Sequence, residues 1–291
     1  MSRTQTVDGE HVLYHYLQKN LSETDVWLFQ MLTARLVVAL GIWLPPEVYS
    51  SMPILLPFAR RDSSARGNKR TGSPESWGSP DAQGYFRDDN SLVKGLVRSL
   101  EISSPLENIY DKRRLGKSFV SSHVWREIVG ADGLPTLASL QPSTYSFVPN
   151  LVWLPAQVSK LTDREGSFVQ QFLQALSHRI YSTVPVREEL SSLVEGIWAR
   201  LPIPPIPAAG LPDTAELSFF HCEDSFVETR QNAVREVADA IRHRLAGSEI
   251  PRAISSRFGT GFRNVGDAEL LQLLETISLH SGLPRVEAPS L

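Results

Sequence analysis

The hydrophobic positions of the chain return mostly every three or four residues, which is the spacing that buries one face of an α-helix. This period predicts helices over residues 9–19, 22–44, 90–102, 156–181 with a break near Gly166, 188–201, 225–245 and 267–279. Two shorter apolar segments, 119–125 and 146–154, are expected to form a small central β element, and the first of them alternates as a strand does. The pattern therefore predicts an α+β fold that is mostly α, with helical flanks around this central element.

Prolines and glycines separate these elements. Pro45 and Pro46 are expected to close the second helix, because neither proline can continue it. Residues 61–84 are rich in Ser, Gly, Pro, Asn and Arg, and without an apolar period they are expected to form a long loop. Residues 201–212 are expected to form a proline-rich connector, and residues 257–266 a turn punctuated by glycines.

These boundaries divide the 291 residues into four regions. An N-terminal helical region covers 1–60, and a loop-rich basic segment with one helix covers 61–114. A core that contains the β element covers 115–184, and a C-terminal helical region covers 185–291. A chain of this length forms one large or two ordinary domains and can bury a sizeable core without disulfides or structural metals.

The net charge of −3 at pH 7 argues against a general nucleic-acid coat, but the charge is unevenly distributed. Residues 60–117 hold twelve Lys and Arg against eight Asp and Glu, so this stretch carries +4 and the remainder carries −7. Of the 29 basic residues 23 are Arg, which suits phosphate oxygens and guanine edges. Codon bias in a GC-rich genome would also explain the arginines, whereas the basic stretch indicates a polyanionic partner.

Several classes of protein are excluded by what the sequence lacks. The single cysteine, Cys222, cannot form an intramolecular disulfide or a cysteine-rich zinc site, and it fits a reducing, cytoplasmic compartment. The N-terminus lacks a secretion signal, and the longest apolar run, 36–46, is too short to span a membrane. The sequence has no phosphate-binding P-loop, no GxSxG elbow and no acidic residue two positions before a lysine. ATPases, serine hydrolases and PD-(D/E)xK nucleases are therefore disfavoured.

The central region holds residues suited to hydrolysis of a phosphodiester. His123 lies on the predicted strand, Asn150 enters the second apolar segment, and Ser159 and Asp163 lie one turn apart on the next helix. An imidazole can deprotonate water, and a hard cation held by oxygen ligands can stabilise the charge that develops at phosphorus. Each residue also has an ordinary structural explanation: a packed core histidine, an asparagine that holds a local turn, and a solvated or helix-capping aspartate.

In this order the residues resemble the HNH, or ββα-metal, nucleases. Residues 118–125, SFVSSHVW, are similar to that family's first strand, and residues 149–155, PNLVWLP, are similar to its asparagine turn. The resemblance gives His123 the place of the general base and Asn150 that of the central asparagine, and it implies Mg²⁺ or Mn²⁺ as cofactor. The metal positions that it implies fall on Ser122, where the family commonly has Asp or His, and on Ser159 or Asp163 in the helix.

Two further segments contain candidate nucleic-acid contacts. The first joins an aromatic pair to polar side chains before a helix, and the second is a basic run that leads into the predicted strand. The candidate contact residues are Arg87, Asn90, Lys94, Lys112, Arg113, Arg114 and Lys117. A capped helix start would explain the first segment equally well, and a solvated loop would explain the second.

Together these features favour a metal-dependent, restriction-like DNA endonuclease of HNH type that hydrolyses phosphodiester bonds in double-stranded DNA. Its helical flanks would supply target recognition and allow a homodimer. The second hypothesis is a catalytically inactive nucleic-acid-binding protein with a decayed HNH core, for which Ser122 and Ser159 are the evidence. The third is a helical protein–protein interaction module, which the charge of −7 outside the basic stretch permits.

Overall fold

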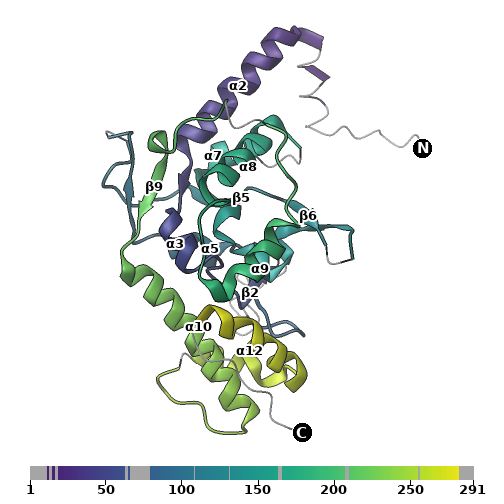
Figure 1. Ribbon diagram of the computed structural model, residues 1–291, viewed down its shortest axis with the longest axis vertical. Coiled ribbons are helices and arrows are strands. Elements are labelled where there is room, and N and C mark those ends of the chain that lie inside the picture. The colour runs from purple at the N-terminus through teal and green to yellow at the C-terminus, as the bar shows by residue number, and fades with distance from the viewer. Residues whose placement is uncertain are drawn as a thin grey trace, which may run out of the picture.

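A computed structural model of the chain describes residues 12, 15–16, 19–62, 65, 79–107, 109–130, 132–162, 166–206, 210–254 and 256–281. The fold is α+β and mostly α, with a small central sheet flanked by helices, as predicted (Figure 1). The α-helices are α2 (Glu23–Leu40), α3 (Pro46–Ser51), α5 (Ser91–Leu96), α6 (Pro142–Tyr145), α7 (Ala156–Ser159), α8 (Phe168–Tyr181), α9 (Glu188–Trp198), α10 (Asp224–Leu245), α11 (Ser256–Gly261) and α12 (Asp267–Ser281). The strands are β1 (Ile42–Trp43), β2 (Ala59–Arg61), β3 (Phe86–Asp88), β4 (Glu101–Ser103), β5 (Phe119–His123), β6 (Glu127–Val129), β7 (Pro135–Leu137), β8 (Leu151–Pro155) and β9 (Ser218–His221).

The central sheet is assembled from distant parts of the chain. Its strand order is β4-β9-β1-β8-β5, with β1 parallel to β9 and the other neighbours antiparallel. β1 comes from the N-terminal region, β4 from the basic segment, β5 and β8 from the core and β9 from the C-terminal region. The four regions distinguished in the sequence therefore share one sheet. Two smaller sheets pair β2 with β3 and β6 with β7.

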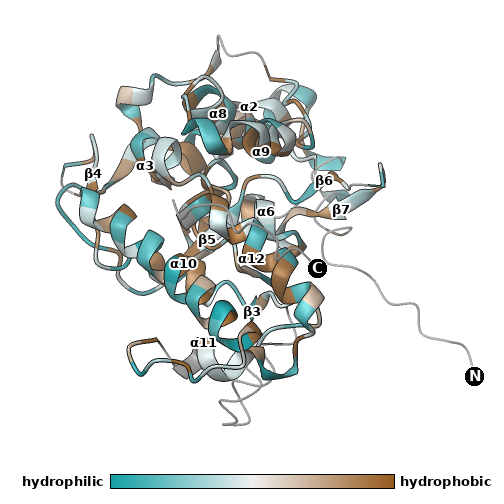
Figure 2. Cartoon of the chain, turned by 60° about the horizontal axis from the view of Figure 1, so that its bottom comes forward, coloured by the Kyte–Doolittle hydropathy of each residue, from teal (hydrophilic) through white to brown (hydrophobic). Residues whose placement is uncertain are grey.

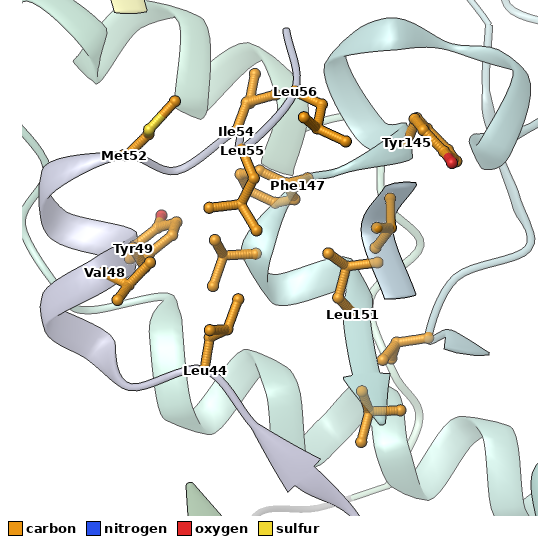
Figure 3. Packing of buried hydrophobic residues seen from close by; sticks show 14 of the residues in the cluster. Leu44, Val48, Tyr49, Met52, Ile54, Leu55, Leu56, Tyr145, Phe147 and Leu151 are labelled. Atoms are coloured by element: carbon orange, nitrogen blue, oxygen red, sulfur yellow. The ribbon is translucent and has the colours of Figure 1, made fainter. Parts of the chain in front are cut away.

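The hydrophobic core surrounds β8. Residues 151–154 of this strand are all buried, as is typical of a strand that is covered on both faces. Figure 3 shows Leu151 and Phe147 beside Leu44, Val48 and Tyr49, which follow β1 and form part of α3. Residues about 100 positions apart in the sequence thus pack together, next to the start of β8.

The second predicted helix is confirmed at its start and corrected at its end. Ser22 caps α2 by accepting a hydrogen bond from the Asp25 N–H, and the Asp25 side chain accepts one in return from the Ser22 N–H. The helix ends at Leu40, and β1 follows it, so the proline pair does not close the helix as predicted. Pro46 instead begins α3, because a proline at the first helical position needs no N–H partner.

Three other predictions are corrected. The second β segment, expected over 146–154, begins as the 3₁₀ turn Val148–Asn150, and only its last residues belong to β8. The helix expected over 90–102 ends at Leu96, and β4 takes its last residues because they pair with β9. The turn expected over 257–266 largely forms α11 and a 3₁₀ turn. The short strands β2 and β3 were not predicted, because their three residues are too few to show an alternating pattern.

The helices expected over 188–201, 225–245 and 267–279 are confirmed as α9, α10 and α12. The helix expected over 9–19 and the loop expected over 61–84 lie mostly outside the described residues. The helix expected over 156–181 is broken at Gly166, whose φ of +71° lies in the left-handed region that glycine tolerates. α10 and α12 pack against each other at one end of the molecule (Figure 1). α10 carries hydrophilic and hydrophobic residues along its length, as expected for a helix with one buried face (Figure 2). Within the described part of the chain, no helix has the length and apolar character needed to cross a membrane.

Candidate active site

β5, β8 and α7 follow the order that the resemblance implies, and β5 pairs directly with β8. β5 and β8 are antiparallel, with His123 opposite Leu151 at the end where β5 finishes. α7 follows β8 directly and packs against both strands. α7 begins beside Ser118, whose carbonyl accepts a hydrogen bond from the Ala156 N–H, and this is the end of the strand pair opposite to His123.

Asn150 joins the two sides of this arrangement. Its side chain is fully buried, and its Oδ1 atom accepts a hydrogen bond of 2.7 Å from the backbone N–H of Trp125. Its Nδ2 atom donates a hydrogen bond of 3.0 Å to the carbonyl of Thr144. One amide thus ties the segment that leaves β5 to the segment that enters β8, across 25 residues of sequence.

Replacement of Asn150 by Ala is expected to lower the free energy of unfolding by about 2–4 kcal/mol, because a buried N–H and a buried carbonyl would lose their partners. The measurement is chemical denaturation followed by circular dichroism. Asn232→Ala is the matched control, because Asn232 is an asparagine on α10 that is not buried, and it should change the free energy by less than about 0.5 kcal/mol. Equal effects of the two substitutions would contradict the bracing role.

The hydrogen bond of His123 fixes the proton on its ring. The Nε2 atom lies 2.9 Å from the carbonyl oxygen of Tyr145. A carbonyl can only accept, so Nε2 carries the hydrogen and Nδ1 is left unprotonated. Burial, with a smaller effect of the Arg61 charge, lowers the pKa of His123 from 6.5 to about 4, although the hydrogen bond to the Tyr145 carbonyl raises it, so the ring is neutral at pH 7. The side chain keeps some contact with solvent, so Nδ1 can accept a proton, and the lowered pKa makes it a weaker base than a free imidazole.

Tyr145 is held in turn by Asp88. Its hydroxyl points away from the hydrophobic cluster (Figure 3) and donates a hydrogen bond to Asp88. Asp88 is buried and also accepts hydrogen bonds from the Ser91 hydroxyl and the Leu92 N–H at the start of α5. Burial and the neighbouring carboxylate raise the pKa of Tyr145, so the hydroxyl remains a donor. These bonds fix the carbonyl that orients His123.

Three further groups surround His123. Asn90 donates from Nδ2 to the carbonyl of Ser121 at 3.2 Å. The Asn90 Oδ1 and Ser121 Oγ atoms are buried, and neither has a hydrogen-bond partner among the described residues. Arg61 is exposed at the end of β2 and has no ion-pair partner in the described part of the chain. We refer to His123, Tyr145, Asp88, Asn90, Ser121 and Arg61 together as the His123 site.

Of this set, His123 and Asn90 were predicted from the sequence, and the other four residues were not. Asp88 had a signal, since it precedes a predicted helix and a carboxylate is a common helix cap. Arg61 lies in the basic stretch, but its sequence position gave no link to His123. Ser121 had a signal, since it lies two residues before His123 on the same strand and therefore on the same face. Tyr145 had none, because only the tertiary structure brings its carbonyl to His123.

The described residues at the implied metal positions do not fit a divalent cation. Successive strand residues point to opposite faces, so Ser122 lies on the face of β5 opposite to His123. Ser159 is buried, and its hydroxyl donates to the carbonyl of Ala156 in its own helix. Asp163 lies outside the described residues. Within the described ranges there is no group of three His, Cys, Asp or Glu side chains that could hold a metal, whereas Mg²⁺ is usually bound through one or two carboxylates.

The candidate nucleic-acid contacts fall into two groups. Arg87 donates to the carbonyl of Ser79 and lies 3.7 Å from Asp62, and Lys94 lies on α5, so both are near Asn90 in the chain. The second group is exposed and precedes β5, at the end of the strand away from His123; its members are Lys112, Arg113, Arg114 and Lys117. Arg114 also pairs with Glu101 at 3.3 Å. The length of β5, about 3.3 Å per residue, therefore separates this run from His123.

The His123 site combines a neutral imidazole, an exposed arginine and two buried oxygen atoms without partners. Two hydrogen bonds hold the end of β5 beside the segment that leads into β8: Asn150 accepts from the Trp125 N–H, and the Tyr145 carbonyl accepts from His123. The chain is not placed in a family by comparison: no family model matches it, and neither a curated protein nor a solved structure gives a significant match.

Proposed function

We propose that the protein is an endonuclease that hydrolyses phosphodiester bonds in double-stranded DNA, with His123 as its general base. The observation that carries this proposal is the hydrogen bond from His123 Nε2 to the Tyr145 carbonyl. It leaves Nδ1 free to take a proton, on a strand end that is braced by Asn150. The order of β5, β8 and α7 along the chain also supports the proposal, and α7 begins at the end of the strand pair opposite to His123.

Each residue of the His123 site would have its own role in the hydrolysis. Nδ1 of His123 takes a proton from a water molecule, whose oxygen forms a bond to phosphorus. The bond from phosphorus to the leaving oxygen breaks, and that oxygen takes a proton from solvent. The Arg61 guanidinium would hold the phosphate oxygens, and Asn90 Oδ1 would accept a hydrogen bond from the attacking water. Asn90 Oδ1 would thereby gain a partner only when the attacking water is present.

The direct test is to incubate the full chain with mixed duplex DNA and to look for discrete fragments, without metal and with Mg²⁺ or Mn²⁺. Fragments that appear with the wild type and disappear with His123→Ala support the proposal. The requirement for Mg²⁺ or Mn²⁺ remains a prediction from the sequence, and the parallel incubations measure it. No cleavage under any of these conditions would contradict an active nuclease.

The runner-up is a nucleic-acid-binding protein without nuclease activity. The observation in its favour is that serines occupy both described positions at which the resemblance expects metal ligands, and that Ser122 faces away from His123. DNA binding without cleavage, in the presence of either metal, would favour this function. Absence of both would favour the interaction module.

Exchange of Arg113 and Arg114 for Ala tests the phosphate role of the basic run. Both side chains are exposed, so the double variant should fold, and its affinity should fall for all DNA sequences alike. The slope of the logarithm of affinity against the logarithm of salt concentration should become shallower by about one for each phosphate that the variant no longer neutralises. Fluorescence anisotropy at several salt concentrations measures both quantities.

The matched control exchanges two other exposed arginines, Arg252 and Arg263, for Ala. It removes the same charge from the C-terminal part of the chain, so a general electrostatic effect would appear in both double variants. An unchanged affinity and salt slope for Arg113→Ala with Arg114→Ala would refute a phosphate role for this run.

A further inference from the structure

A pocket lies between α12, α9 and the turn that begins α6, and His123 is not among its lining residues. Its volume is about 210 Å³. It is lined by Ile54, Pro57, Tyr85, Gln141, Pro142, Ser143, Leu193, Thr276 and His280. Pockets for drug-sized ligands are commonly larger, about 300–1,000 Å³, so this pocket suits a smaller molecule.

His280 is the unusual member of this lining. It is 1% exposed, and neither of its ring nitrogens has a hydrogen-bond partner among the described residues. A buried polar group without a hydrogen-bond partner destabilises the folded state. In the neutral ring of His280, one nitrogen is a donor and the other an acceptor, and both lack a partner among the described residues. Because His280 lines the pocket, a molecule bound there could supply the missing hydrogen-bond partner.

The charge around His280 favours an anion as that partner. Arg187 donates from Nη2 to the carbonyl of Leu279, the residue before His280, at 3.2 Å. The Nε atom of Arg187 is also buried without a partner among the described residues. No Asp or Glu is found among the described residues that line the pocket. A guanidinium close to a buried imidazole N–H thus creates a positive field with no carboxylate from those lining residues to neutralise it.

The other lining residues indicate which chemical groups the rest of the ligand carries. Gln141 and Ser143 are partly exposed and can donate hydrogen bonds. Four lining residues are aliphatic or proline: Ile54, Pro57, Pro142 and Leu193. We propose that this pocket binds a small organic carboxylate with a short apolar body, its carboxylate at His280 and its apolar part against these four side chains. This binding does not depend on the proposed nuclease activity.

Isothermal titration of the full chain with butyrate and with butyramide tests the proposal in a buffer that contains no carboxylate. The two probes have nearly the same shape and differ in charge. Butyrate is expected to bind at least about tenfold more tightly than butyramide. His280→Leu should weaken butyrate binding at least about tenfold, because the imidazole donor is removed. His221→Leu is the control, since His221 is an exposed histidine on β9 outside this pocket.

Equal binding of the two probes, binding of neither, or unchanged butyrate binding in His280→Leu would overturn the proposal. Circular dichroism establishes whether His280→Leu is folded. If it is not, Gln141→Ala replaces it, because Gln141 is partly exposed and its side chain is not required by the core. That variant must then weaken butyrate binding, and unchanged binding would equally overturn the assignment.

Discussion

His123→Ala is expected to reduce the rate of DNA cleavage by about 10²–10⁴-fold, because general-base catalysis contributes a factor of this size. Affinity for DNA should change little, since phosphate contacts from arginine and lysine dominate affinity. The free energy of unfolding should fall by only about 1 kcal/mol, because the Tyr145 carbonyl loses its hydrogen-bond partner while the cost of burying the ring is removed. Cleavage of a labelled duplex under single-turnover conditions measures the rate.

The control for this variant is His221→Ala, which removes an exposed histidine from the end of β9, a strand of the same sheet. It should leave cleavage unchanged. A large loss of stability in His123→Ala with an unchanged cleavage rate would show instead that His123 is a packed core residue. The hydrogen bond to the Tyr145 carbonyl would then be structural.

The second large effect expected is a loss of stability in mild acid. Burial lowers the pKa of His123 and of His280 from 6.5 to about 4. The unfolded chain therefore takes up protons at these residues as the pH falls below 6.5, while the folded protein resists protonation until the pH is near 4. Their neutral forms favour the folded state fully above pH 6.5, and this contribution is lost as the pH falls to 4.

The size of this loss follows from the shift in pKa. It amounts to about 3 kcal/mol for His280 and less for His123, whose side chain keeps some contact with solvent. Denaturation between pH 7.5 and pH 4 in buffers without carboxylates measures it. A variant with His123→Gln and His280→Gln should show a much flatter dependence, whereas His221→Gln should not. The same fall in the double variant would refute the assignment to these two histidines.

The sequence alone predicted the elements whose evidence lies within one segment. α2, α8, α10 and α12 repeat apolar residues with the helical period, and the start of α2 is set by a capping box between Ser22 and Asp25. β5 was predicted because its apolar and polar residues alternate and because Gly116 and Gly130 bound this segment. The order of His123 and Asn150 along the chain also indicated the order of β5, β8 and α7, because the resemblance depends on the order of residues.

The sequence could not predict elements that depend on a distant partner. β4 and β9 have three and four residues, and each forms because the other supplies its hydrogen bonds. Residues 97–102 kept a helical spacing and yet left the helix for the same reason. Local propensity is weak compared with pairing at the edge of a sheet, so the tertiary structure decided these segments.

The same distinction applies to the candidate sites. Residue types fixed what chemistry was available: a histidine for proton transfer, an asparagine for bracing and arginines for phosphate. Only the tertiary structure decided which of them meet, since Tyr145, Asp88 and Arg61 reach His123 through the packing of α6, β3 and β2. It also decided that His280 is buried without a partner among the described residues. Burial and contact depend on where distant segments cross in space, and for that reason they are not contained in any local pattern of residues.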